Sequence, residues 1–101
     1  MRIGWVGGLL RARVELEETA AAAGHELEVH SGDVRGRGAQ ELSKVVDRCD
    51  VVVIVIEVNS HGGALQAKHL ARLRGRPAVV VRRSSSSTLR RVIASLEATA
   101  A

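Results

Sequence analysis

The segment Val51-Val-Val-Ile-Val-Ile56 decides the fold, because six consecutive apolar residues predict a strand that is buried on both faces. Three more short apolar runs end, as this one does, at a cluster of glycines and polar residues. These runs are Ile3–Val6, Leu27–Val29 and Ala78–Val81. If all four are parallel strands, their polar ends meet at one edge of one sheet, where open α/β folds bind ligands.

The outer runs differ in pattern. Ala78–Val81 is continuously apolar and follows Pro77, so it is similar to the central run and predicts burial on both faces. Glu26-Leu-Glu-Val29 alternates between charged and apolar residues. This alternation predicts an edge strand with one exposed face.

Helical segments separate the strands. Leu42–Cys49 and Leu89–Leu96 carry apolar residues at positions i, i+3, i+4 and i+7, and Val14–Ala23 and Ala64–Leu73 are rich in helix formers. Right-handed crossovers then predict one α/β domain over residues 1–101, a Rossmann-like sandwich with a four-stranded parallel sheet. By analogy with flavodoxin-like sheets, we expect the strand order 2-1-3-4.

Length and composition narrow the class of protein. A chain of 101 residues with 46% apolar residues has room for one domain, and its only aromatic residue is Trp5. The single Cys49 excludes an internal disulfide and fits a reducing compartment, so we expect a cytoplasmic protein. The longest apolar run is too short to span a membrane, and we see no secretory signal.

The net charge of +4 raises the question of nucleic-acid binding. The arginines are scattered along the chain, however, and there is no Tyr or Phe on which bases could stack. The sequence therefore argues against a nucleic-acid partner and leaves a small anionic molecule as the expected ligand.

The serine-rich turn after the fourth strand is one candidate anion site. One serine must cap the following helix, and the free N–H groups of a helix start attract anions. Arg83, Ser84 and Ser85 would then hold a phosphate or a carboxylate. The alternative is that the serines only cap the helix.

The turn after the third strand, Asn59-Ser60-His61-Gly62-Gly63, has a similar pattern. Ser60 is a suitable helix cap, and the glycines let a ligand approach the backbone. His61 could donate a hydrogen bond, exchange a proton as a general acid or base, or bind a metal. The alternative is a histidine that packs on the loop.

Two further turns complete the candidate edge. His30 and Ser31 end the second strand, and with the first strand between them the backbones of His30 and His61 would lie roughly 10 Å apart. Both histidines, together with Asp33, could then hold a transition metal, or one histidine could bind a haem. Gly7 and Gly8 permit close approach of a ligand at the first turn, where Arg11 could reach back to an anion.

These motifs, taken in order, resemble a bacterial family of small proteins known as domain of unknown function 2325. The likeness extends from Arg2 to about Ile93 and is carried by Gly7-Gly8, His30, Ser60-His61 and Arg83-Ser84-Ser85. The resemblance implies that these positions form the family's site, and it implies no activity. The family pattern often has a larger polar residue where this chain has Gly62.

Four functions stay open. The leading hypothesis is a binding module for a small anionic ligand, for example a phosphorylated one, held at the carboxyl edge of the sheet. The second is a metal or haem protein that uses His61 and His30. The third is an enzyme with His61 as its general acid or base. The fourth is an interaction or structural homodimer that associates through alanine-rich helix faces.

Overall fold

The computed structural model describes residues 1–100. Four strands alternate with four helices: β1 (Arg2–Val6), α1 (Arg13–Ala22), β2 (Glu26–His30), α2 (Gly38–Arg48), β3 (Val51–Val55), α3 (His61–Leu73), β4 (Ala78–Val81) and α4 (Ser86–Ala100). A short 3-10 turn, η1 (Leu10–Ala12), precedes α1. Within these residues, no helix has the length and apolarity that crossing a membrane requires.

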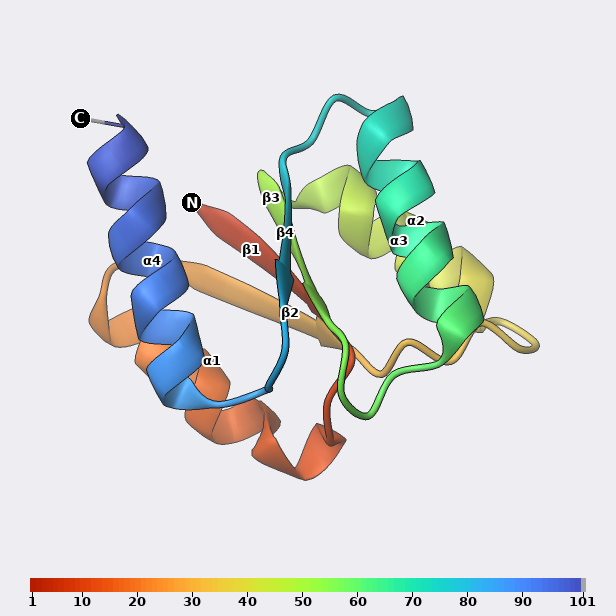
Figure 1. The fold of residues 1–101 in the computed structure, drawn as a ribbon, viewed down its shortest axis with the longest axis horizontal. Helices are drawn as coiled ribbons and strands as arrows, with labels where there is room; N and C mark the ends of the chain where they lie inside the picture. The colour runs from red at the N-terminus through yellow and green to blue at the C-terminus, as the bar shows by residue number, and fades with distance from the viewer. Residues whose placement is uncertain (101) are drawn as a thin grey trace.

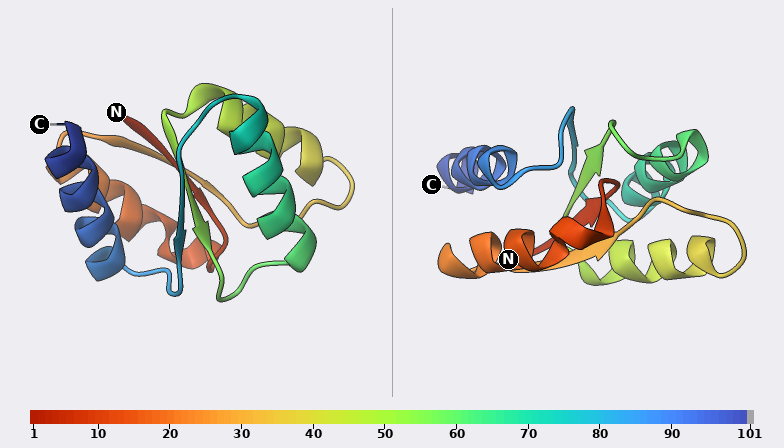
Figure 2. Two further views of the ribbon diagram at one scale, coloured as in Figure 1. Left: turned by 45° about the horizontal axis from the view of Figure 1, so that its top comes forward. Right: turned by 90° about the horizontal axis from the view of Figure 1, so that it is seen from below.

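The four strands form one parallel sheet in the order β2-β1-β3-β4, which confirms the predicted 2-1-3-4 arrangement of a flavodoxin-like fold. Helices α1 and α4 lie side by side on one face of the sheet, and α2 and α3 cover the other (Figures 1 and 2). Because every strand runs in the same direction, the four turns that follow the strands are brought to one edge.

The central strand β3 divides the core into two halves. Val51, Val53 and Val55 pack with Trp5 under α1 and α4. Val52 and Ile54 point to the other face and pack with Leu42 under α2 and α3. Every residue of β3 is buried, as its sequence predicts. Residues that alternate along one strand therefore hold both helical layers on the sheet.

The prediction that β4 is buried on both faces is wrong. β4 is an edge strand, Ala78 is exposed, and Val80 is 46% exposed. The described residues supply no fifth strand beside it, so an apolar sequence that would suit a central strand lies at the sheet edge. At the other edge, β2 has the edge position that its glutamates predict, but its exposure does not alternate: Leu27, Glu28 and Val29 are all half-buried.

Trp5 links the core to the turn that leads into α4. Its side chain is fully buried, and its indole Nε1–H donates a hydrogen bond to Ser84 Oγ over 3.1 Å. A buried donor without an acceptor is costly, so this contact fixes where the last turn lies on the sheet.

We expect Ser84→Ala to lower the free energy of unfolding by about 1–3 kcal/mol, because it leaves the indole N–H unpaired. Urea denaturation followed by the fluorescence of Trp5 measures the change. Ser87→Ala is the matched control: Ser87 is exposed, so its effect should stay within about 0.5 kcal/mol. Equal effects of the two substitutions would contradict this role for Ser84.

Candidate functional site

The turns after β1, β2 and β3 line an open hollow of about 760 Å³ at the carboxyl edge of the sheet. The ends of these strands come together in Figure 1, below the centre of the view. The residues that line the hollow come from all three turns and from the start of α3: Gly8, Leu9, Leu10, Ser31, Asp33, Val34, Arg35, Val58, Asn59, Ser60 and Gly62. We call this hollow the edge pocket.

Asn59 joins the strands beneath the edge pocket. Its Nδ2 donates to the carbonyl oxygen of Val55 at 2.7 Å and to that of Val6 at 3.3 Å. Its Oδ1 is buried and accepts no hydrogen bond from a described residue. The backbone of Gly32 packs so closely on this carboxamide that a Cβ there would lie 1.9 Å from Oδ1. Asn59 therefore requires a residue without a side chain in the β2–α2 turn.

Ser60 links the same turn to the start of α3. Its Oγ accepts the N–H of Gly63 at 2.8 Å, as an N-cap, and donates to the carbonyl oxygen of Gly32 at 2.6 Å. The first intrahelical donor is Ala64, which bonds the Ser60 carbonyl. The N–H groups of His61 and Gly62 precede it, so they can donate to an anion.

Apolar side chains form the rim of the edge pocket. Leu9, Leu10 and Val58 are 45%, 54% and 59% exposed, and Val34 lies beside them. Val58 has a φ of 50°, which a β-branched residue rarely adopts. The backbone N–H of Gly8 donates to its carbonyl oxygen at 2.8 Å. This bond holds the backbone of Val58 in its left-handed conformation, which costs on the order of 1–3 kcal/mol, and so keeps the apolar side chain at the pocket.

An ion pair between Asp33 and Arg35 lies at the mouth. Arg35 donates from Nε to Oδ1 and from its terminal nitrogen to Oδ2, both at 3.0 Å, and its backbone N–H also bonds Oδ1. The side-chain hydrogen bonds of Arg35, followed by the backbone bond, lower the pKa of Asp33 to about 2. The two opposite charges largely cancel at neutral pH.

His30 has a structural role at the end of β2. It is buried, its Nδ1 accepts the N–H of Gly32 at 2.9 Å, and its Nε2 lies 3.0 Å from the carbonyl oxygen of Gly38. Because Nδ1 must accept, Nε2 carries the proton and donates, and neither nitrogen is free to bind a metal. His30 therefore fixes the β2–α2 turn from below.

The structure gives no support to the predicted metal site on His30 and His61, because both ring nitrogens of His30 have backbone partners. His61 is exposed at the start of α3 and does not line the edge pocket. Over residues 1–100, no group of three or more His, Cys, Asp or Glu side chains could hold a metal ion. The haem alternative stays a prediction, with His61 as the histidine that could serve as an axial ligand.

The serine-rich turn does not line the edge pocket, although it adjoins it: Ser84 packs on Gly8, where a Cβ would lie 2.5 Å from Ser84 Oγ. Ser84 accepts from Trp5, and Ser85 Oγ accepts the N–H of Thr88 at 3.1 Å as the cap of α4. Arg83 Nε lies 3.8 Å from a carboxylate oxygen of Glu57. These groups already have partners in the chain, which fits the helix-cap alternative.

The predicted site residues are thus divided in space. Gly8, Ser31 and Ser60 line the edge pocket. Gly7 packs on Asn59 below it, and Arg11 is exposed on η1 outside it. Sequence reasoning missed the apolar rim and the Asn59 carboxamide. The signal for the rim was present: Leu9, Leu10, Val34 and Val58 are large apolar residues in turns that would otherwise be polar.

Cys49 lies at the opposite end of the sheet. Burial, followed by the neighbouring Glu28 carboxylate, raises the pKa of its thiol to about 12. The reactive thiolate is therefore scarce at neutral pH, which excludes Cys49 as a nucleophile there.

The fold and the edge pocket together define a Rossmann-like α/β domain with a ligand-sized hollow at the carboxyl edge of its sheet. A family model described as "uncharacterized protein conserved in bacteria (DUF2325)" matches residues 2–96, and the chain belongs to this family. No curated protein and no solved structure matches the chain.

We expect His30→Ala to lower the free energy of unfolding by about 2 kcal/mol or more, because two backbone groups lose their partners. Urea denaturation measures this change. Zinc added to the wild-type protein should leave its melting temperature unchanged. A zinc-dependent rise that His30→Ala abolishes would show that His30 is a metal ligand instead.

We expect Arg35→Gln to raise the pKa of Asp33 from about 2 toward 3.8, because it removes the guanidinium hydrogen bonds. The folded pKa lies below the ordinary value, so the pair stabilises its loop above pH 3.8 and this contribution is lost as the pH falls through 2. A carboxyl-carbon NMR titration measures the midpoint. Lys44→Gln, at an exposed position on α2, is the control and should leave it unchanged.

Proposed function

We propose that this protein is a small-molecule-binding module, and that its edge pocket holds an amphipathic anion such as a phosphorylated compound with an apolar body. One observation carries the proposal: four large apolar side chains surround a pocket at a helix start, and one of them, Val58, is held there in a strained conformation. Observed backbone strain of this kind is concentrated at ligand sites.

The start of α3 is suited to the anionic group. The N–H group of Gly62, which lines the edge pocket, can donate to its oxygens, and the positive end of the helix dipole favours negative charge.

The rim favours an apolar body on the ligand. Covering Leu9, Leu10 and Val58 would remove exposed apolar surface from water, at about 25 cal/mol for each Å² covered. Inorganic phosphate covers none of this surface, so it should bind more weakly than an organic phosphate.

The titratable groups of the edge pocket favour a binding role over a catalytic one. Of the residues that line the edge pocket, Asp33 and Arg35 are the titratable ones, and they neutralise each other. Proton transfer needs a group near its working pH, whereas Asp33 titrates at about 2. A single buried Cys49 fits a cytoplasmic location for such a module.

We expect phenyl phosphate to bind at the edge pocket, and inorganic phosphate and phenol each to bind at least about tenfold more weakly. Amide chemical shifts in NMR measure both the affinity and the place. The amides of His61 and Gly62 should move, and those of Ser87 and Thr88 at the start of α4 should not. Shifts confined to the start of α4 would favour the serine-rich turn instead, and no shifts with any probe would refute the module.

Two rim variants sharpen this test. Leu9→Glu places a carboxylate beside the anion and should weaken phenyl phosphate by about tenfold. Leu73→Glu, at a 66% exposed leucine at the other end of α3, is its control. Val58→Gly removes an apolar contact but relieves the positive φ, so it should weaken binding while raising the free energy of unfolding by about 1 kcal/mol.

A further inference from the structure

The edge strand β4 offers unpaired backbone groups. The carbonyl oxygens of Pro77 and Val81 accept from Val52 and Ile56 at 2.9 Å, so the odd-numbered residues direct their backbone toward β3. Backbone groups alternate in direction along a strand, and those of Ala78 and Val80 therefore point away from the sheet. Such an edge is a template on which another strand can form.

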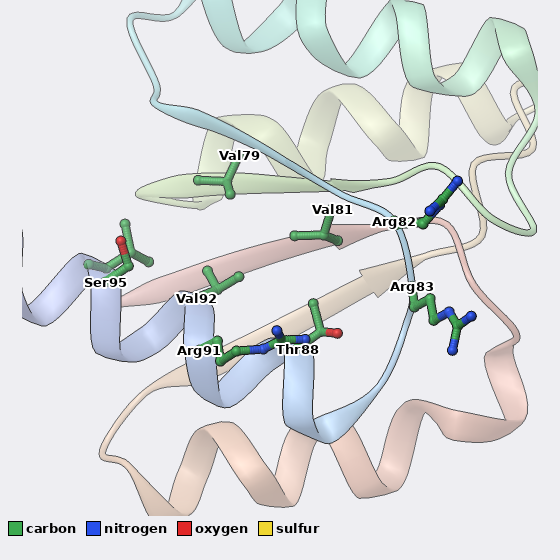
Figure 3. Close-up of a pocket in the computed structure, with 9 residues that line it drawn as sticks. Val79, Val81, Arg82, Arg83, Thr88, Arg91, Val92 and Ser95 are labelled. Atoms are coloured by element: carbon green, nitrogen blue, oxygen red, sulfur yellow. The ribbon is translucent and has the colours of Figure 1, made fainter.

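An apolar groove accompanies this edge on the α4 side. It has a volume of about 580 Å³, and Val79 and Val81 form one wall. Val92 of α4, labelled in Figure 3, and Leu96 form the other wall. Side chains of an added strand that point to this face would enter the groove, which favours apolar residues at those positions.

The opposite face of β4 is basic. A second hollow, of about 410 Å³, is lined by Ala78 and Val80 together with Lys68, Arg72 and Arg76. The alternate side chains of an added strand would point to this face. Three cations over two small apolar side chains favour acidic residues at those positions.

The two edges of the sheet are built differently. β2 carries Glu26 and Glu28, which pair with Arg2 and Arg48 along that edge. Charges of this kind prevent edge-to-edge association. β4 has the sequence Ala-Val-Val-Val and no charge within the strand.

The positive charges around β4 argue against two of the partners that could pair with this edge. Lys68, Arg72, Arg82 and Arg91 line the two hollows, are exposed, and form no ion pair with any residue in the described part of the chain. A second copy paired through β4 would bring two such sets together, and their repulsion opposes a homodimer here. Nucleic acid would place phosphates on an apolar floor that has no aromatic side chain for its bases.

We propose that β4 binds an extended peptide segment of a partner protein as a fifth strand, and that this segment alternates apolar with acidic residues. The backbone of Ala78 and Val80 supplies the hydrogen bonds. The groove beside α4 takes the apolar side chains, and Lys68, Arg72 and Arg76 take the acidic ones. Strand addition with pockets for alternate side chains is an established mode of peptide recognition.

The test uses a fluorescein-labelled peptide in which three valines alternate with three glutamates. Fluorescence anisotropy should show saturable binding to the full-length protein. A peptide with the same residues in two blocks, and one in which lysine replaces each glutamate, should bind at least about tenfold more weakly. Equal binding of the alternating and blocked peptides would overturn the proposal, as would no binding below about 1 mM.

Variants locate the binding surface. Val80→Pro removes the outward N–H and should weaken the peptide at least about tenfold. If proline unfolds the strand, the double variant Lys68→Glu with Arg72→Glu replaces it in the test. This double variant should bind the glutamate peptide more weakly and the lysine peptide more tightly than the wild-type protein does. Arg90→Glu, on the exposed side of α4 and outside both hollows, is the matched control.

Two further measurements distinguish a peptide from the other possible occupants, a second copy of the chain and nucleic acid. Light scattering should show a monomer; a dimer that Val80→Pro dissociates would assign the edge to a second copy. A labelled single-stranded DNA should bind more weakly than the peptide. Tighter DNA binding that the Lys68→Glu and Arg72→Glu substitutions abolish would assign it to nucleic acid.

Discussion

The site depends on the side-chain amide of Asn59. Its Nδ2 bridges the carbonyl oxygens at the ends of β1 and β3, and its Oδ1 packs against Gly32 in the turn after β2. Ser60 follows and bonds the Gly32 carbonyl while it caps α3. Two consecutive residues thus hold three turns at fixed separations. Without this tie, each turn would be free to close over the edge of the sheet, because loops lack the ladder bonds that hold strands.

The same tie explains how a strained valine persists beside the edge pocket. Val58 directly precedes Asn59, and its carbonyl oxygen is held by the N–H of Gly8. A left-handed valine survives only where the surrounding contacts outweigh its cost. Because glycine at this position would fold with less strain, stability does not account for the valine. Under the proposed function, an apolar contact with the ligand accounts for it, and the conformational cost and the exposed rim then have one explanation.

The sequence predicts what depends on neighbours along the chain and fails where distant groups decide. Buried β3, the edge position of β2 and the strand order follow from apolar periodicity and crossover handedness. The exposure of β4 depends on whether a fifth strand exists, which its own four residues do not encode. The role of Ser84 depends on Trp5, 79 positions away, and that of His30 on the carbonyl oxygen of Gly38. Spacing places these groups at one edge but does not say which atoms are already bonded.

The two proposed binding surfaces meet where β3 and β4 end. The N–H of Glu57 donates to the Arg82 carbonyl at 3.1 Å, and its carboxylate lies 3.8 Å from Arg83 Nε. Val58, the next residue, lines the edge pocket, while both arginines line the groove beside α4. A strand added to β4, as proposed, would place apolar side chains in the groove that Arg83 lines. A shift of Arg83 there would act on its ion pair with Glu57, the residue that precedes the strained valine, so the two proposals share one stretch of backbone.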